Sequence, residues 1–278
     1  MKIGFLSDFF EQHLLGGAEL NDGVLIDHLQ KSHQVIRLIS SATTKSDIDS
    51  VDFVIVSNFA SANPQLLDYI IFSKPYLVYE HDHKYVTNRD PSKFKNFNIP
   101  NEFIVNRELY ASARKVVCLS SSQTSIIESN LGLKNLENIS CSLWSQKRLN
   151  LLRELSKVEK NQIFAIMDSA NPIKNTVLAQ KMCEQKSIPY ELISSKDQEQ
   201  FIRILSRYEG LVFIPGVLES LSRLVTEAKM MNCKIITTPK MLGASYEDWF
   251  SLSGEPLIDV IEENVARALN LFGEIIEQ

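Results

Sequence analysis

The sequence lacks three features that would assign it to a specialised class of protein. No apolar run is long enough to span a bilayer, and Met1–Leu6 leads into polar and aromatic residues rather than into the apolar core of a signal peptide. The formal net charge of −5 lacks the basic excess that nucleic-acid binding requires. The four cysteines are scattered and form no Cys-x-x-Cys pair: Cys118, Cys141, Cys183 and Cys233. We therefore expect a reduced, cytoplasmic globular protein that binds no nucleic acid.

Along most of the chain, short apolar runs alternate with longer segments of helical periodicity. The runs expected to form strands are Lys2–Leu6, Gln34–Ile39, Phe53–Ser57, Tyr76–Tyr79, Lys115–Leu119, Gln162–Met167, Tyr190–Ile193, Leu211–Ile214, Lys234–Thr237 and Pro256–Ile258. The segments expected to form helices are Glu19–Lys31, Pro64–Phe72, Ser122–Leu131, Asn175–Lys186, Asp197–Tyr208 and Asp259–Ile276. The expected strands are continuously apolar, which is typical of parallel sheets covered by helices on both faces.

The alternation restarts near residue 160. A polar segment rich in lysine, arginine and glutamate, Ser145–Lys160, precedes the restart and is expected to be a helix that joins two halves. The length of 278 residues is enough for two domains, each with its own core. The sequence therefore predicts an α/β protein with two doubly wound parallel-sheet domains, residues 1–150 and residues 151–278, facing a cleft.

The most specific pattern lies between residues 210 and 243. Glu219 and Glu227 follow an apolar run that ends at Pro215, and the helical pattern that contains Glu227 leads into a second apolar run. Other glutamate pairs in the chain have the same spacing, but this pair follows the carboxyl end of a strand, where open α/β sheets bind ligands. A helix N-terminus, capped here by Ser220 or Ser222, can face a diphosphate, and two carboxylates can accept hydrogen bonds from sugar hydroxyls. The pattern favours a sugar-nucleotide site.

This segment resembles the Glu-x7-Glu signature of the retaining GT-B glycosyltransferases of family 4 (glycosyl transferases group 1), of which the chain would be a compact member. The resemblance implies two Rossmann-like domains facing a cleft, with the acceptor on the N-terminal domain and the nucleotide sugar on the C-terminal domain. It also implies that Glu227 accepts hydrogen bonds from the ribose hydroxyls and that catalytic Glu219 accepts them from hydroxyls of the donor sugar.

Two motifs in the first half fit the same resemblance. Gly16 and Gly17 follow the first expected strand, and in the family a Gly-Gly loop at this place lies beside the donor phosphates. The alternative is a glycine-rich turn with no ligand, and the G-x-G-x-x-G spacing of a dinucleotide site is absent. His81 ends the fourth expected strand, and the family implies that it contacts the transferred sugar or the acceptor. With His83 it could instead form a pair of surface histidines, whereas a metal site would need a third ligand that the sequence does not supply.

The diphosphate clamp of the family is only partly present. Lys174 stands where a family lysine neutralises the diphosphate, although it could also be an ordinary solvated lysine at a helix start. Asp168 stands where the family usually has arginine, and an acidic residue cannot bind phosphate. We hypothesise that Arg223 replaces that arginine. Ser222 stands where the family often has glycine, three residues after the first glutamate.

Residues 84–115 contain more basic than acidic side chains, with phenylalanines between them. This segment is either a set of solvated loops or a place where the protein touches an anionic membrane or a lipid-linked acceptor. No Ser/His/Asp triad is evident, and Ser120–Ser122 is expected to cap a helix.

The resemblance implies a retaining, metal-independent glycosyltransferase of the hexosyltransferase type. Its donor would be a UDP- or GDP-sugar, its acceptor a glycan, a lipid-linked molecule or a small molecule, and its setting polysaccharide biosynthesis. Two alternatives stay open. The altered clamp favours a non-catalytic protein that binds a sugar nucleotide or glycan, and a nucleotide-sugar epimerase would share the two-domain plan.

Overall fold

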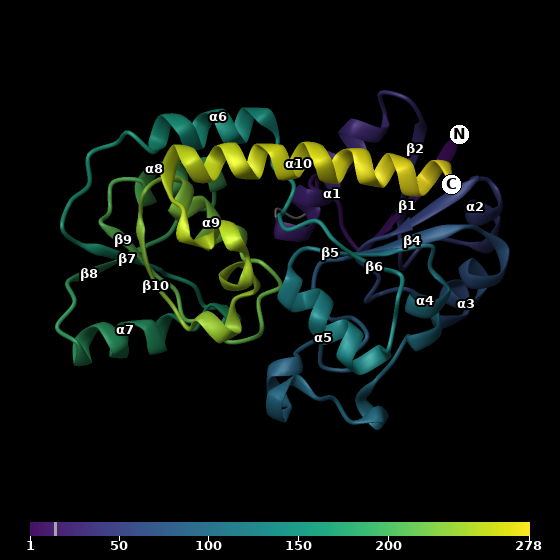
Figure 1. Cartoon of the computed structure of the whole chain (residues 1–278), viewed down its shortest axis with the longest axis horizontal. Helices are drawn as coiled ribbons and strands as arrows, with labels where there is room; N and C mark the ends of the chain where they lie inside the picture. Colours follow the sequence, from purple (N-terminus) through teal and green to yellow (C-terminus); the bar gives the residue numbers. More distant parts are fainter. Residues whose placement is uncertain (14–15) are drawn as a thin grey trace. The chain divides into compact units, whose positions relative to one another are not determined.

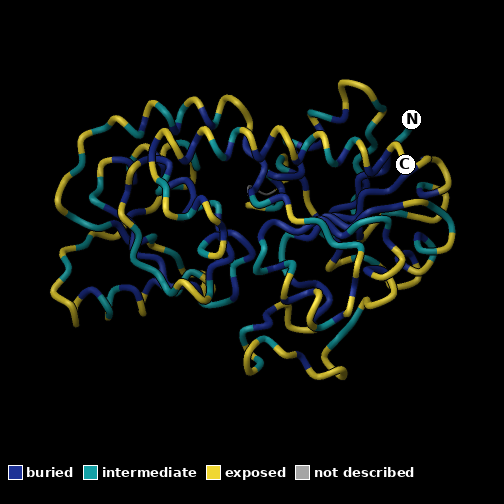
Figure 2. The backbone as a smooth tube through the Cα atoms, viewed as in Figure 1, coloured by how far each residue is buried: buried dark blue, intermediate teal, exposed yellow. Residues whose placement is uncertain are grey.

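The structure, a computed structural model, describes residues 1–13 and 16–278. The described residues form two compact units, the first made of 1–144 with 264–278 and the second of 145–263. Each unit has its own parallel sheet with helices packed around it (Figure 1). The central strands of each sheet are largely buried, whereas the strands at the sheet edges are partly exposed (Figure 2). The predicted α/β class with two Rossmann-like parallel-sheet domains is confirmed.

Within the described residues, the first unit contains a six-stranded parallel sheet in the order β2-β1-β3-β4-β5-β6. Its strands are β1 (Lys2–Ser7), β2 (Gln34–Ile39), β3 (Phe53–Val56), β4 (Tyr76–Glu80), β5 (Val116–Cys118) and β6 (Leu136–Asn138). The chain moves from β1 to β2 on one side and then returns to place β3 on the other side of β1. This reversal creates a topological switch point, and ligands of open α/β sheets bind beyond the carboxyl ends of the strands at such a point.

Side chains of Thr44, Asn63 and Ser120 cap three of the helices of the first unit. The helices of this unit are α1 (Gly17–Leu29), α2 (Lys45–Asp49), α3 (Pro64–Ser73), α4 (Arg107–Ser112) and α5 (Ser121–Leu131), with short 3-10 turns η1 (Pro91–Lys93), η2 (Lys95–Phe97) and η3 (Asn101–Phe103). The Ser120 hydroxyl accepts from the backbone N–H of Gln123, so the predicted cap of α5 is confirmed. Gly132, with φ of 70°, ends the same helix in the left-handed conformation that glycine adopts without strain.

The second unit has, in the part of the chain that is described, a four-stranded parallel sheet in the order β10-β9-β7-β8. Its strands are β7 (Phe164–Met167), β8 (Tyr190–Ile193), β9 (Gly210–Val212) and β10 (Lys234–Ile236). Its helices are α6 (Gln146–Leu155), α7 (Thr176–Gln185), α8 (Gln198–Leu205), α9 (Arg223–Met230) and the start of α10 (Gly254–Glu277), with 3-10 turns η4 (Pro172–Lys174), η5 (Pro239–Met241), η6 (Gly243–Tyr246) and η7 (Asp248–Ser251). A Cβ atom on Gly210 would lie 2.3 Å from the carbonyl oxygen of Lys234, so only glycine fits at the start of β9.

The predicted strand at Pro256–Ile258 is wrong, because these residues belong to the first turn of α10. Proline is tolerated there, since the first N–H groups of a helix have no partner within the helix. Leu257 and Ile258 look like a short apolar strand, but Ile261 and Val265 continue a buried stripe at helical spacing. One further strand, β6, was not predicted. It is three residues long and lies at the sheet edge, where its residues are only partly buried.

Helix α10 begins in the second unit and ends in the first. Near its end, Phe272, Ile275 and Ile276 are buried. The Arg114 guanidinium donates hydrogen bonds to the carbonyl oxygens of Ile275 (3.1 Å) and Ile276 (3.3 Å), which lie in the last turn and have no partner within the helix. Residues 264–278, which the sequence assigned to the C-terminal domain of 151–278, thus pack with the first unit, and the first boundary follows residue 144 rather than 150.

Candidate functional site

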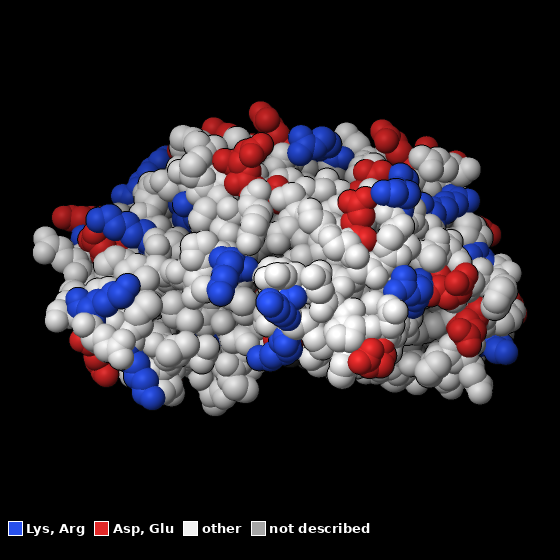
Figure 3. Space-filling view, turned by 60° about the horizontal axis from the view of Figure 1, so that its bottom comes forward, with Lys and Arg blue, Asp and Glu red and all other residues white. Residues whose placement is uncertain are grey.

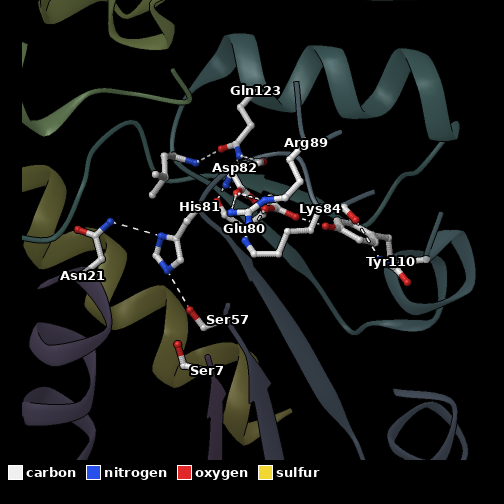
Figure 4. Close-up of polar contacts among 12 residues, drawn as sticks. Ser7, Asn21, Ser57, Glu80, His81, Asp82, Lys84, Arg89, Tyr110 and Gln123 are labelled. Carbon is white, nitrogen blue, oxygen red and sulfur yellow. Dashed lines mark hydrogen bonds and ion pairs between the residues drawn. The ribbon is translucent and has the colours of Figure 1, made fainter. Parts of the chain in front are cut away.

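Polar side chains meet at the carboxyl ends of β1, β3 and β4 in the first unit. Asp22, on α1, is fully buried, and its carboxylate accepts hydrogen bonds from the hydroxyls of Ser7 (3.1 Å) and Ser57 (2.7 and 2.9 Å). His81 follows β4, and its Nε2 atom lies 2.9 Å from the Ser57 hydroxyl (Figure 4). The same atom lies 2.9 Å from the Asp22 carboxylate. The cluster therefore lies at the switch point of the sheet, and it contains the predicted residue His81.

The second ring nitrogen of His81 also has a protein partner. The amide nitrogen of Asn21 lies 3.4 Å from Nδ1 (Figure 4). The amide oxygen of Asn21 accepts from the backbone N–H of Leu143 at 2.9 Å. The ring centroid lies 4.2 Å from that of Tyr79, so the imidazole is also packed against an aromatic ring. Only 6% of the His81 side chain is exposed. Whether His81 contacts a sugar or an acceptor stays a prediction.

His83 is completely buried, so the interpretation of the two histidines as a surface pair is wrong. Neither of its ring nitrogens has a hydrogen-bond partner among the described residues. Desolvation lowers the pKa of His83 to about 4, although Asp82 and Asp90 act in the opposite direction. In the described part of the chain, no group of three or more His, Cys, Asp or Glu side chains is arranged to hold a metal ion.

Next to the histidines, a buried network of charged residues fixes the end of β4. Lys84 lies 3.1 Å from the fully buried Glu80 and 2.7 Å from Asp82, and the Tyr110 hydroxyl donates to Glu80 (Figure 4). Desolvation raises the pKa of Glu80 even though Lys84 opposes the shift. Desolvation acts in the same direction on Asp82, but the positive charges of Lys84 and Arg89 outweigh it and lower the pKa of that carboxyl. These ion pairs hold the loop that carries His81.

Most basic side chains of residues 84–115 have partners within the first unit. Lys84 and Arg89 pair with Asp82, Arg107 donates to Asn130 and Leu131 carbonyls, Arg114 donates to the end of α10, and Lys115 pairs with Glu137 at 2.5 Å. Lys93 lies 3.6 Å from Asp90 but is 60% exposed, and Lys95 is also exposed. The face in Figure 3 shows small separate groups of basic side chains among uncharged ones. None of the described helices is long and apolar enough to cross a membrane, and membrane contact through residues 84–115 stays a prediction.

At the start of α1, the buried carboxyl group of Glu19 lies beside Gly16. Leu15, the first residue of the Gly-Gly motif region, lies outside the described residues, whereas Gly16 is the N-cap and Gly17 begins the helix. The buried carboxylate of Glu19 accepts hydrogen bonds from its own backbone N–H and from that of Gly16, and desolvation raises its pKa. A Cβ atom on Gly16 would lie 2.2 Å from this carboxylate, so glycine is required for the contact. Glu19 thus lies where a donor phosphate was expected, and phosphate binding by Gly16 and Gly17 stays a prediction.

In the second unit, two loops at the carboxyl ends of neighbouring strands are joined. The backbone N–H of Gly216, after β9, donates to the carbonyl oxygen of Ile173 in η4, after β7, at 2.9 Å. A Cβ atom on Gly216 would lie 2.8 Å from the carbonyl oxygen of Pro172. The junction brings together the predicted residues Lys174 and Glu219, whose Nζ and Oε1 atoms are 3.4 Å apart with side-chain exposures of 30% and 17%. Lys174 is therefore paired and partly buried rather than an ordinary solvated lysine.

The backbone that leads into α9 is strained. Ser222 is the N-cap of α9, with φ of 76° and ψ of 92°, a region that residues with a Cβ atom rarely adopt. Its side chain makes no capping hydrogen bond, so the predicted capping by Ser222 is wrong. The backbone of Glu219 is fixed by hydrogen bonds on both sides, to Met241 (3.0 Å) and from Gly243 (2.8 Å). Ser222 thus occupies a glycine-like conformation, three residues after the first glutamate of the motif.

The second glutamate of the motif is held by two arginines. Glu227 is buried in α9, and its Oε2 atom lies 2.5 Å from Nη2 of Arg148, on α6. Its Oε1 atom lies 3.6 Å from Nη2 of Arg223, one turn earlier on α9. The structure therefore places Arg223 beside Glu227. Arg148 was missed by sequence reasoning, because it is 79 residues away and lies in a segment read as a polar linker helix.

Comparisons with known proteins identify the fold. No protein-family model matches the sequence, and no curated protein matches it. A sucrose-phosphate synthase from Thermosynechococcus elongatus is similar in structure, with a TM-score of 0.64, 10% sequence identity and 99% of both chains covered. A glycosyltransferase from Rickettsia africae ESF-5 gives a TM-score of 0.54 at 15% identity, covering 100% of this chain and 99% of that one. HepE from Anabaena, solved in complex with UDP and glucose, gives a TM-score of 0.52 at 13% identity, covering 96% of this chain and 89% of that one. The chain therefore has the GT-B fold, built from two Rossmann-like domains.

Proposed function

We propose that the protein is a retaining glycosyltransferase that uses a nucleotide-sugar donor. The observation that carries the proposal is the pairing of Lys174 with Glu219 at the carboxyl ends of β7 and β9, with Glu227 following on α9. A cation and two carboxylates at this edge of a sheet suit a ligand that joins a diphosphate to two polyhydroxylated rings. The complex of HepE with UDP and glucose supports the same ligand class.

The second unit would bind the donor. Glu227 would accept hydrogen bonds from the ribose hydroxyls, and Arg148 and Arg223 would keep its carboxylate in one orientation. Glu219 would accept hydrogen bonds from hydroxyls of the donor sugar. Lys174, with the positive N-terminal end of the α9 dipole, would stabilise the diphosphate as negative charge develops on it during bond cleavage. The positive charge of Lys174 and of the N-terminus of α9 would allow the diphosphate to leave without a metal ion.

The first unit would bind the acceptor, with the cluster around His81 and the Gly16–Gly17 loop at the carboxyl edge of its sheet. The donor would be a UDP- or GDP-hexose and the acceptor a glycan or a lipid-linked sugar, in the assembly of a polysaccharide. The acceptor hydroxyl would attack the anomeric carbon on the face that the diphosphate leaves, which retains the configuration.

A specific observation favours a second candidate, a non-catalytic protein that binds sugar nucleotides. Asp168 is exposed at the end of β7, and its backbone N–H donates to Ile193 at 2.8 Å. Its negative charge lies in the loop that leads to Lys174, where the family places an arginine, so the diphosphate would be held less tightly during cleavage.

The first experiment is a thermal-shift titration with UDP, GDP, ADP, dTDP and their common sugar conjugates. A ligand present at about a hundred times its Kd should stabilise the protein by roughly 2.7 kcal/mol. We expect a shift that is selective for one base, absent in Glu227→Ala and kept in Glu199→Ala, which removes an exposed glutamate of α8. No shift with any nucleotide would refute both candidates. Binding without transfer or hydrolysis of the donor would favour the non-catalytic one, and isomerisation of the donor without acceptor would indicate an epimerase.

A further inference from the structure

Two consecutive residues of α1 contact both nitrogens of the His81 ring. Asn21 lies 3.4 Å from Nδ1, and Asp22 lies 2.9 Å from Nε2. Both residues are buried, with exposures of 2% and 0%. The imidazole ring also packs against the ring of Tyr79, and the centroid of the Tyr79 ring lies 4.9 Å from that of Phe272. The imidazole therefore has little freedom to turn.

The hydrogen bonds define which ring nitrogen carries the proton. The backbone N–H of Leu143 donates to the amide oxygen of Asn21, so the amide oxygen must face Leu143 and the NH₂ group must face His81. An NH₂ group is a donor, and Nδ1 must therefore accept. The ring proton is then on Nε2, where the Asp22 carboxylate and the Ser57 hydroxyl can accept it. A proton on Nδ1 would place two donors against each other, and turning the amide would place its NH₂ group against the N–H of Leu143.

We propose that Asn21 and Asp22 are positioning residues that hold His81 as the Nε2–H tautomer, so that His81 does not take the proton of the acceptor hydroxyl. The part that concerns the acceptor rests on the proposed function. A general base needs a lone pair aimed at the hydroxyl that it deprotonates. The lone pair of Nδ1 is aimed at Asn21, and Nε2 has none.

The proton of the acceptor must then go elsewhere. In the proposed reaction, the bond between the anomeric carbon and the diphosphate oxygen breaks, and the bond between that carbon and the acceptor oxygen forms. The diphosphate oxygen that leaves with the electron pair can receive the acceptor's proton, so that charge balances without a protein base. His81 would instead be a residue of fixed orientation at the carboxyl edge of the first sheet, with no role in proton transfer.

The tautomer is tested without substrate. Long-range 1H–15N spectra of the full chain, labelled on histidine, distinguish protonated from unprotonated ring nitrogens, and loss of one set of signals in His81→Gln assigns the residue. We expect a protonated Nε2 and an unprotonated Nδ1 at pH 7. In Asn21→Asp, whose carboxylate can only accept, we expect both nitrogens to be protonated, whereas His28 on the same helix should keep its wild-type signals. A proton on Nδ1 in the wild type would overturn the proposal.

The catalytic part is tested by kinetics. With a donor and acceptor that support transfer, His81→Gln should lower kcat less than about tenfold, because loss of a general base costs roughly 10²–10⁴-fold. A larger loss, together with disappearance of a limb of the pH–rate profile that the wild type shows, would mean that His81 is the base. If no donor supports transfer, the proposed function fails, while the spectra still decide the tautomer.

Discussion

The Nη2 atom of Arg148 lies 2.5 Å from Oε2 of Glu227, although α6 and α9 are far apart in the sequence. Arg223 approaches the other carboxylate oxygen, so two guanidinium groups define the orientation of one buried carboxylate. A carboxylate held in one orientation can also accept hydrogen bonds from a diol, which is the role proposed for Glu227. Arg148 therefore becomes part of the candidate nucleotide site.

Arg148→Met should weaken nucleotide binding about tenfold, which corresponds to roughly 1.4 kcal/mol. The variant should also lose about 1.5–3 kcal/mol of unfolding free energy, because the buried Glu227 would lose a hydrogen bond from a charged group. Isothermal titration calorimetry and urea unfolding measure the two effects. Arg203→Met is the matched control, since Arg203 pairs with Glu199 on the exposed face of α8. Equal nucleotide affinity in the wild type and Arg148→Met would exclude Arg148 from the site.

Ser222→Gly should stabilise the protein by about 1 kcal/mol, because glycine adopts the φ of 76° without the steric cost of a Cβ atom. Thermal unfolding measures the change. The control is Ser156→Gly at the C-cap of α6, where φ is −64° and glycine should instead destabilise. If both variants lose stability, the strain inferred at Ser222 does not exist.

Glu219→Gln and Lys174→Met should each lower the rate of sugar transfer about a hundredfold, the size expected when one group that stabilises developing charge is removed. Because the two side chains contact each other, the double variant should be less impaired than the product of the single effects. Steady-state kinetics with the donor identified by thermal shift give these values. Lys181→Met, on an exposed position of α7, is the control. Fully multiplicative effects would show that the pair does not act as a unit.

The stability of the protein should fall as the pH drops from about 6.5 towards 4, and His83 should cause part of the fall. Its pKa is about 4 in the folded chain against an ordinary value of 6.5, so the unfolded chain binds more protons in this range. At pH 5, the lowered pKa of His83 should reduce the free energy of unfolding by roughly 2 kcal/mol relative to neutral pH. Urea unfolding at pH 7.5 and pH 5.0 should give a smaller difference for His83→Phe than for the wild type. His13→Gln, at an exposed position, should show the same difference between the two pH values as the wild type. If His83→Phe also shows the wild-type difference, His83 does not cause the loss of stability.

Much of the fold could be predicted from the sequence, because buried parallel strands are continuous apolar runs with helical segments between them. Two errors have physical causes. Leu257 and Ile258 are buried on one side of a helix, and over three residues such a stripe cannot be distinguished from a strand. Leu136–Asn138 is an edge strand, which is only half-buried and carries no apolar signal. That the end of α10 packs with the first unit depends on contacts between distant residues, which no local pattern records.

The candidate site was predictable where its residues follow strands. His81, Lys174 and Glu219 all lie directly after a strand or in the loop beyond it, and that position is readable from the apolar runs. The partners of these residues were not predictable. Arg148 and Asp22 lie on helices, where a charged residue normally indicates a solvated face, and only the packing of those helices turns them inward.

The path of α10 has a consequence for synthesis of the chain. The strands of the first unit are made before the second unit, whereas Phe272, Ile275 and Ile276, which are buried in the first unit, are made after it. The second unit, a stretch of about 120 residues, is made in between, which takes roughly 6–24 s at ordinary rates of translation. The first unit therefore stays incomplete on the nascent chain, with part of its apolar surface uncovered, until the end of α10 has been made.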